Sequence, residues 1–372
     1  MNFNLQNMIS CVCCMLYNVF SMMLNVDYKT PRHYTRYNIH GTIFFILCYS
    51  FNMLAQDPHY SNWQMSPLNQ NPANTGMFEG DLRLILNYRN QWQQVKVPYN
   101  TFSFGTDFNC NKTLIKGTKE AVGLMFNHDV AGDGRYTITE FKIPFNHKIT
   151  FKKDTGLTLG IGVLAGLTNL SIDPNKLSYD NQWDGDMYNS GLSNGENFLR
   201  QSKLVTDFSF GVVIQKKFKQ HLSATIGYGI NHINQPNISF NDTKDVTLKM
   251  RHSENLQLKY SVNQISAVMF EYYGNQQQAF KENLVGLSYY HTIDPKTNTI
   301  LNAGLFMRTG DALITTIGLE QRNMRLQVSY DYNYSQFKRA TNGRGGFEIS
   351  LIYIHAKQKV FIPKSRVCPI YM

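Results

Sequence analysis

The chain has 372 residues, of which 17% are charged, against about 25% in a typical soluble domain. Aromatic residues reach 13%, with 24 Phe, 22 Tyr and 3 Trp, and the formal net charge is +10. The longest apolar stretch, 41–55, contains Ser50 and Asn52 and falls short of the roughly 20 apolar residues that a membrane-spanning helix needs. The many aromatic residues also exclude a disordered chain. Low charge, abundant Tyr and Phe and no apolar helix are together typical of a transmembrane β-barrel.

Residues 1–55 predict an upstream extension followed by a secretory signal that is removed. Basic residues precede the apolar stretch 41–54, and Ala55 fits a cleavage site. We expect cleavage before Gln56, which removes three basic and one acidic side chain and lowers the net charge from +10 to +8. Residues 1–27 have no folding pattern and are interpreted as the result of a start codon assigned too early, a genuine extension being the alternative.

Segment 56–81 does not alternate between polar and apolar residues, although it is rich in Trp, Tyr and Met. Pro58, Pro67 and Pro72 block the interior of both a strand and a helix. We expect an ordered element that either lies on the periplasmic side of the barrel or fills its lumen, where polar walls satisfy its backbone. The alternative is an unordered amino end.

From residue 82 to 357 the dominant signal is a period of two, the pattern of strands with two different faces. In the clearest case Leu326, Val328 and Tyr330 alternate with polar residues. About 14 strands follow, many near the 10 residues that cross a bilayer at a tilt. The expected strands are 82–90, 100–109, 119–128, 136–150, 155–165, 203–215, 220–230, 244–254, 257–272, 280–292, 298–308, 312–320, 324–334 and 345–357.

This pattern predicts an antiparallel up-and-down barrel with apolar residues toward lipid and polar residues toward the lumen. The links after even-numbered strands are mostly short and those after odd-numbered strands mostly long, with 166–202 the longest, as expected for periplasmic turns and external loops. We therefore expect both mature termini, including a tail over 358–372, in the periplasm. A soluble β-sandwich or lipocalin-like barrel is the alternative, but it would need two domains and a linker. The interfacial girdles are expected to include Tyr88, Tyr289, Tyr330, Tyr334 and Tyr353.

Catalytic and cofactor motifs are absent or weak, so we expect neither an enzyme nor a bound cofactor. The acidic loops 129–134 and 180–186 match the spacing of calcium loops only loosely and are interpreted as solvated external turns. The positive charge lies in short turns and on the polar strand phase, which favours anionic lipid or periplasmic partners over nucleic acid. After cleavage only Cys110 and Cys368 remain, and whether they pair is left open.

One string of residues resembles a known family, the outer-membrane PorP/SprF proteins of the type IX secretion system of Bacteroidetes. The resemblance covers the chain from Gln56 to its end, and its motifs are concentrated in 57–92. The matching residues are Asp57, Pro58, Tyr60, Ser61, Pro67, Asn71, Pro72, Ala73, Gly76, Tyr88, Arg89, Asn90, Gln91 and Trp92, with Cys368, Pro369 and Tyr371 at the carboxyl end.

The resemblance implies a barrel that supports protein export by docking the translocon and periplasmic ring proteins. It further implies secretion or surface attachment of cargo proteins, including gliding adhesins. The alternative is a diffusion porin or a channel for hydrophobic substrates, whose lumen Arg83, Arg89, Arg308 and Arg325 would line. A linked hypothesis is that Tyr88, Arg89 and Trp92 hold segment 57–76 against the barrel.

Overall fold

The computed structural model describes residues 59–91, 99–110, 115, 117–151, 156–196, 199–218, 221–241, 243–244, 246–335 and 338–356. The predicted signal and extension over 1–55, Asp57, Pro58, Trp92, Cys368 and the tail over 358–372 lie outside these residues. No helix in the described part of the chain is long and apolar enough to span a membrane.

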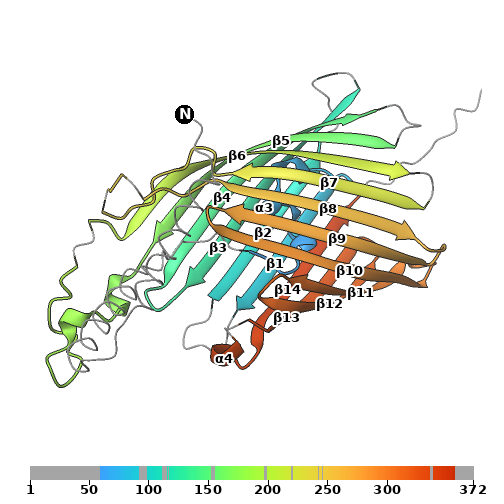
Figure 1. Ribbon diagram of the computed structural model, residues 1–372. Helices are drawn as coiled ribbons and strands as arrows, with labels where there is room; N and C mark the ends of the chain where they lie inside the picture. Colours follow the sequence, from blue (N-terminus) through green and yellow to red (C-terminus); the bar gives the residue numbers. More distant parts are fainter. Residues whose placement is uncertain are drawn as a thin grey trace, which may run out of the picture. The chain divides into compact units, whose positions relative to one another are not determined.

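Fourteen antiparallel strands close into one barrel in which each strand pairs with its neighbours in sequence and β1 pairs with β14 (Figure 1). The predicted fold class is therefore confirmed. The strands are β1 (Leu82–Gln91), β2 (Tyr99–Asn109), β3 (Thr118–Ala131), β4 (Tyr136–Thr150), β5 (Leu157–Ser171), β6 (Ser202–Phe218), β7 (Leu222–Asn231), β8 (Arg251–Ser261), β9 (Ser266–Gln277), β10 (Phe280–Asp294), β11 (Thr299–Arg308), β12 (Ala312–Gln321), β13 (Met324–Asn333) and β14 (Arg344–His355).

The predicted strands 244–254 and 257–272 are wrong in their boundaries. The structure turns at 262–265 rather than at 255–256, so that β8 and β9 both begin later than expected. The outward residues His252 and Glu254 are polar like the inward ones, so the amino-terminal half of β8 has a weak alternation, which explains the shift. Residues 232–250, assigned partly to a strand, form the link between β7 and β8.

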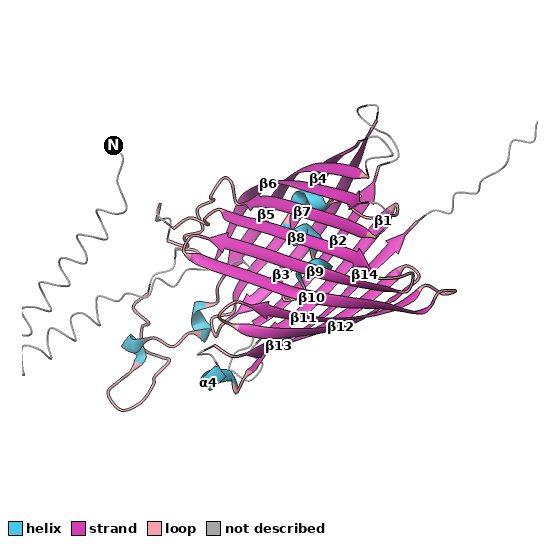
Figure 2. Ribbon diagram, turned by 45° about the vertical axis from the view of Figure 1, so that its right-hand side comes forward, coloured by secondary structure: helices cyan, strands magenta, loops and turns pink. Residues whose placement is uncertain are grey.

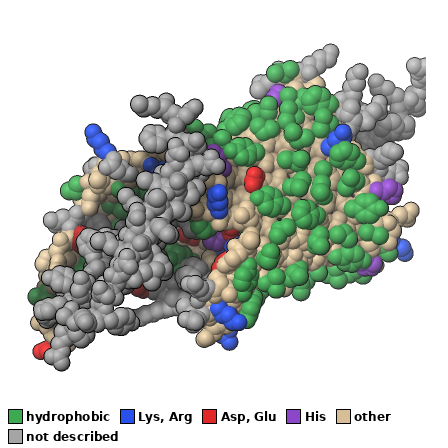
Figure 3. All heavy atoms as spheres, in the orientation of Figure 1, with side chains coloured by type: hydrophobic (Ala, Val, Ile, Leu, Met, Phe, Trp, Pro, Cys, Tyr) green, Lys and Arg blue, Asp and Glu red, His purple; other side chains and the backbone are tan. Residues whose placement is uncertain are grey.

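Side-chain exposure follows the predicted period of two along the strands. In β1 Leu86 and Tyr88 are exposed at the outer surface, whereas Arg83, Asn87 and Arg89 are buried in the lumen. The same alternation produces the apolar face that Figure 3 shows over the outer surface of the barrel. Closing the sheet into a cylinder also pairs the backbone N–H and C=O groups of the first and last strands. A hydrocarbon environment requires this, because lipid tails cannot form hydrogen bonds with them.

The two ends of the barrel differ in their connections. One end carries the links 172–201, 232–250 and 334–343, and we call it the loop end. The other end carries shorter links such as 262–265 and 322–323, and we call it the turn end. Short helical turns occur in the loop-end links, as η3 (Pro174–Lys176), η4 (Asp180–Gln182) and α4 (Lys338–Thr341).

Residues 59–81, which we call the luminal segment, run through the inside of the barrel (Figure 2). The segment contains three single-turn helices, η1 (Trp63–Met65), α3 (Pro67–Gln70) and η2 (Pro72–Asn74), and the prolines stand at first-turn positions, where the missing N–H is not needed. The sequence left open whether this ordered element lies on the periplasmic side of the barrel or fills its lumen. The described residues correspond to an element that fills the lumen.

The luminal segment crosses from the loop end to the turn end. His59 lies beside Glu282, close to the β9–β10 link, and Gly80 lies beside His355 at the turn end. The first and last described residues, His59 and Ala356, are thus at opposite ends of the barrel. The predicted mature termini, residues 56–58 and 357–372, lie outside the described residues, so the expectation that both are periplasmic stays a prediction.

Candidate functional site: a luminal segment fixed by buried charges

The amino-terminal part of the luminal segment is held by one serine, Ser61, that contacts four strands. The Ser61 hydroxyl donates to Asp331 Oδ2 at 2.6 Å and accepts from Arg89 Nη1 and Arg308 Nη2, each at 2.6 Å. The Ser61 backbone N–H donates to Glu348 Oε2 at 2.9 Å. Ser61 is 1% exposed, so these bonds are formed away from bulk water. Charge-assisted bonds of this kind are roughly twice as strong as neutral ones.

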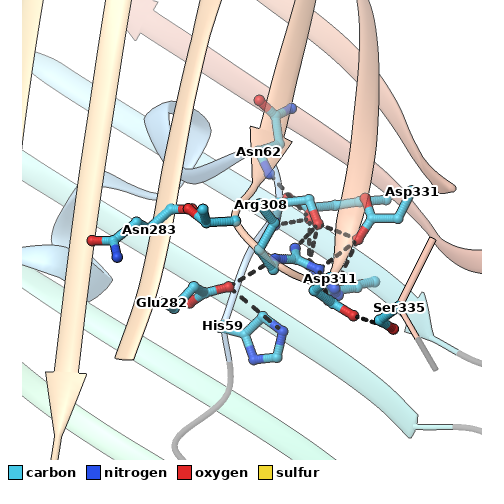
Figure 4. A network of polar contacts seen from close by, with 12 residues as sticks. His59, Asn62, Glu282, Asn283, Arg308, Asp311, Asp331 and Ser335 are labelled. Atoms are coloured by element: carbon cyan, nitrogen blue, oxygen red, sulfur yellow. Dashed lines mark hydrogen bonds and ion pairs between the residues drawn. The ribbon is translucent and has the colours of Figure 1, made fainter. Parts of the chain in front are cut away.

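The charged side chains around Ser61 form a continuous network on β1, β10, β11, β13 and β14 (Figure 4). Arg89 lies 3.2 Å from Asp331 and 3.5 Å from Glu348. Arg308 lies 2.8 Å from Glu282 and 3.2 Å from Asp331. All five side chains are at most 5% exposed. Because an unpaired buried charge is very costly, the two arginines and three acids form an interdependent set.

His59 and Tyr60 enter the same region at the start of the segment. Burial and the nearby positive charges of Arg89 and Arg308 hold the pKa of His59 well below its usual range. His59 Nε2 is 3.9 Å from Glu282. Burial also raises the pKa of the Tyr60 hydroxyl. Both side chains are therefore neutral near pH 7, in agreement with their place inside the barrel.

Apolar contacts hold the middle of the luminal segment. The Trp63 ring stacks on Tyr273, with ring centroids 5.4 Å apart. These contacts replace water inside the lumen by packed side chains, which stabilises the segment through the hydrophobic effect. The two apolar clusters consist of Trp63, Tyr273, Leu284, Phe306 and Ile314, and of Met65, Leu68, Ile85, Met125, Leu164 and Ile352.

Asn71 anchors the next turn of the segment to the opposite wall. Its side-chain amide donates to the carbonyl oxygens of Val212 and Tyr228 at 3.0 and 3.2 Å, and its Oδ1 accepts from Ala73 N at 2.9 Å. A glycine faces the turn here: a Cβ added to Gly162 would lie closer than 3.0 Å to the backbone of Ala73. The wall therefore has room for the backbone of the segment only because this position has no side chain.

The carboxyl-terminal part of the segment is fixed by a second buried ion pair. Arg83 binds Asp107 with two N–H groups at 2.9 and 2.8 Å and donates to the Asn74 carbonyl at 3.0 Å. Asp107 also accepts from the Gly76 N–H at 2.6 Å, and Lys148 donates to the Gly76 carbonyl at 2.7 Å. Gly76 has φ +69° and would clash with Ala121 if it carried a Cβ, so glycine is needed there.

Most of the described family-like residues are thus brought together in the lumen, whereas Tyr88 and Asn90 are on the outward phase of β1. Pro67 and Pro72 begin helical turns, Ala73 is fully buried, and Gln91 is buried at the loop end of β1. Tyr88 does not hold the segment, contrary to the hypothesis: it is 43% exposed on the outer surface, because successive residues of a strand face opposite sides. Of the three residues in that hypothesis, Arg89 contacts the segment, whereas Trp92 lies outside the described residues.

The sequence reasoning missed the partners on the barrel wall. It did not single out Asp107, Asp331 or Glu348, although an acid in the inward phase of a strand is a usable signal. It predicted that the polar phase faces the lumen, and Ile85 and Leu164 are apolar residues of that phase. These residues interrupt the alternation where the luminal segment packs on the wall.

The four arginines predicted to line an open lumen do face inward, but each is paired. Besides the pairs above, Arg325 lies 2.7 Å from Glu320. A cavity of about 440 Å³ remains between the luminal segment and the wall, lined by Gln64, Arg83 and Arg325 among others. Within the described part of the chain, no group of three His, Cys, Asp or Glu side chains could hold a metal ion.

These features define an outer-membrane β-barrel whose lumen contains its own amino-terminal segment. The family model described as "Type IX secretion system membrane protein PorP/SprF" matches residues 52–353. The chain belongs to this family, as its motifs indicated, and the family and the barrel indicate a structural or transport protein of the outer membrane.

Solved structures with a similar fold are outer-membrane channels of low sequence identity. The toluene transporter TodX of P. putida has a TM-score of 0.45 and 10% identity, over 77% of this chain and 93% of that one. The CymD monoaromatic hydrocarbon channel has a TM-score of 0.46 and 11% identity, over 79% and 94%. The KdgM porin has a TM-score of 0.33 and 6% identity, over 72% and 98%. No curated protein matches the chain.

Proposed function

We propose that this barrel serves type IX secretion as a docking component whose lumen is occupied, and that it supports export or surface attachment of cargo proteins. The observation that carries the proposal is the anchoring of the luminal segment at both ends by buried ion pairs, Arg89–Asp331 and Arg83–Asp107. A diffusion pore needs a lumen that no such anchored segment occupies. A segment fixed along its whole length instead gives the barrel rigid surfaces at both ends for partner proteins.

In this proposal the turn end faces the periplasm and the loop end faces the cell exterior. The distribution of long and short links supports this orientation, which is usual for outer-membrane barrels. Periplasmic ring proteins and the translocon then meet the turns and the cavity beside the luminal segment. His59, the first described residue of the luminal segment, then lies toward the exterior.

The test uses Arg89→Ala in cells that carry the type IX machinery. Loss of Arg89 removes its contacts with Ser61, Asp331 and Glu348 and weakens the hold on the segment without changing the outer surface. We expect normal membrane insertion, impaired cargo export and weaker recovery of ring and translocon proteins with the barrel. Normal export by an inserted Arg89→Ala protein would refute the role of the luminal segment.

Planar-bilayer recordings separate this function from the porin alternative. The unmodified barrel is expected to give no large, steady conductance, because its lumen holds residues 59–81. A large and steady open pore from the unmodified protein would favour a diffusion porin instead.

A further inference from the structure

The strand register reveals a polar site on the lipid-facing surface of β7 to β10. Tyr228 pairs with Glu254, Glu254 with Gly274, and Gly274 with Asn283, so these outward residues form one row across four strands. The next row toward the loop end contains His252, Gln276 and Lys281. We call this site the polar notch, made of Tyr228, His252, Glu254, Gln276, Lys281 and Asn283.

The rows on the turn-end side of the polar notch are apolar. Ile226, Leu256 and Val285 share a row with the ring of Tyr272, and the row after that contains Leu258, Phe270 and Leu287. In Figure 3 the hydrophobic face over these strands is accordingly bordered by charged and histidine side chains at the end nearest the long loops. The notch thus lies at the edge of the apolar band, where the headgroups of the adjacent leaflet are found.

Hydrogen bonds give the polar notch a fixed shape. The Tyr272 hydroxyl lies 2.8 Å from Glu254 Oε1 and 3.1 Å from Asn283 Oδ1. The Tyr228 hydroxyl lies 2.8 Å from His252 Nδ1. Gly274 has no side chain and leaves space at the centre of the row for the Glu254 and Tyr272 side chains. An added Cβ would meet both at 2.7 Å.

A groove of about 560 Å³ opens over the polar notch, with Tyr228 46% exposed beside it. Among the described residues, Glu254 and Lys281 form no ion pair with each other or with another side chain, although both charges lie on the lipid-facing phase. Lipid tails do not stabilise a charged side chain in that phase, whereas a polar ligand would form hydrogen bonds or ion pairs with it.

We propose that the polar notch binds the saccharide headgroup of an outer-leaflet glycolipid. An exposed tyrosine ring beside planar carboxylate and amide groups suits a sugar, whose hydroxyls both donate and accept hydrogen bonds and whose C–H face packs on aromatic rings. Lys281 adds a donor for hydroxyl or acidic substituents. The apolar rows beneath the notch receive the acyl chains of the same molecule, which favours a glycolipid over a protein partner.

This inference rests on the orientation proposed above, because the glycolipid of a Gram-negative outer membrane is in its outer leaflet. The binding test does not depend on that orientation. The barrel is reconstituted into phosphatidylcholine nanodiscs that contain lipooligosaccharide in both leaflets, extracted into mild detergent, and analysed for retained lipooligosaccharide per barrel by native mass spectrometry. Phosphatidylglycerol, which has acyl chains and a negative charge but no sugar, is the parallel probe.

The test variant is Glu254→Leu/Lys281→Leu, and the matched control is Thr315→Leu, a polar-to-apolar change on the lipid-facing phase of β12. We expect the double variant to retain about tenfold less lipooligosaccharide, the effect of losing about 1.4 kcal/mol of charge-assisted hydrogen bonding. Its unfolding midpoint should stay the same or rise, because leucine suits the lipid phase better than a charge. The control should retain as much as the unmodified barrel.

Equal retention by the double variant and the unmodified barrel would overturn the proposal. The proposal would also be overturned if the unmodified barrel retained as much phosphatidylglycerol as lipooligosaccharide, or if Thr315→Leu lost as much lipooligosaccharide as the double variant. Either result would mean that acyl packing alone holds the lipid. Because the secretion assay uses Arg89 in the lumen and this assay uses outward residues, the two proposals can fail separately.

Discussion

At the scale of single residues, Arg89 has the largest expected effect on stability. Arg89→Ala leaves Asp331 and Glu348 buried with one cation fewer, a situation that costs about 3–5 kcal/mol. We expect the free energy of unfolding, measured by urea titration of the barrel in detergent, to fall by that order. Tyr88→Ala is the matched control, because Tyr88 is the neighbouring residue and faces outward.

The buried charges also predict a partial rescue. Adding Glu348→Gln to Arg89→Ala removes one of the carboxylates that the arginine balanced, so part of the lost stability should return. A double variant as unstable as the sum of two independent losses would contradict the network and point to separate contributions.

His59 predicts how the anchoring depends on pH. Its pKa is lowered in the folded protein by burial and by Arg89 and Arg308, with Glu282, Asp311 and Asp331 also facing it. Well above pH 6.5 the ring is neutral whether the segment is bound or released, so it contributes no pH dependence there. Below pH 6.5 the released segment takes up a proton that the bound one does not, and the anchoring weakens as the pH falls.

The measurement is protease sensitivity of the luminal segment between pH 7.5 and 5, with His59→Gln as the comparison. The unmodified barrel should become more sensitive on acidification than His59→Gln. Identical pH profiles of the two proteins would show that His59 does not contribute, leaving the acids of the network as the cause of any change.

At the scale of elements, the fit between η2 and the wall depends on a position without a side chain. Gly162→Ala places a methyl group closer than 3.0 Å to the backbone of Ala73, which cannot move aside like a flexible side chain. We expect η2 to be displaced and the protease sensitivity of the luminal segment to rise, while the barrel still folds because β5 keeps its strand pairing. Gly318→Ala is the control, since the three atoms nearest to its new methyl group belong to the movable side chain of Asn302.

The strands were predictable because lipid and lumen impose a strict alternation on each of them. Leu326, Val328 and Tyr330 follow this rule without interruption, and β13 was placed nearly at its observed bounds. The start of β8 was misplaced because its inward residues are polar and its outward phase begins with His252 and Glu254, so the two faces do not differ there.

The luminal segment was only partly predictable from the sequence. Its prolines and its lack of periodicity indicated an ordered element that is not a strand. The pairing of Arg83 with Asp107, and of Ser61 with Asp331 270 residues away, depends on closing the barrel, which no local pattern encodes. The inward apolar residues Ile85 and Leu164 were the available signal that something packs inside.

At the scale of the whole barrel, the path of the luminal segment links the two ends. It begins beside Glu282 near the loop end and leaves at Gly80 beside His355 at the turn end, and a buried ion pair holds it near each end. In the proposed function, partner binding at the turns and cargo binding at the loops would then affect the same luminal segment. This coupling requires that the two ends face different compartments.

Labelling of single cysteines in intact cells tests that requirement. Cys110 and Cys368 are first replaced by serine, and a cysteine is then introduced at Asp184 in the longest loop or at Arg322 in the β12–β13 turn. A membrane-impermeant maleimide should label the cysteine at 184 in intact cells, because that loop is expected outside. The cysteine at 322 should react only after the outer membrane is permeabilised. The reverse pattern would place the turn end outside and invert the proposed orientation, while labelling of both sites in intact cells would mean that the reagent passes through the barrel or the membrane.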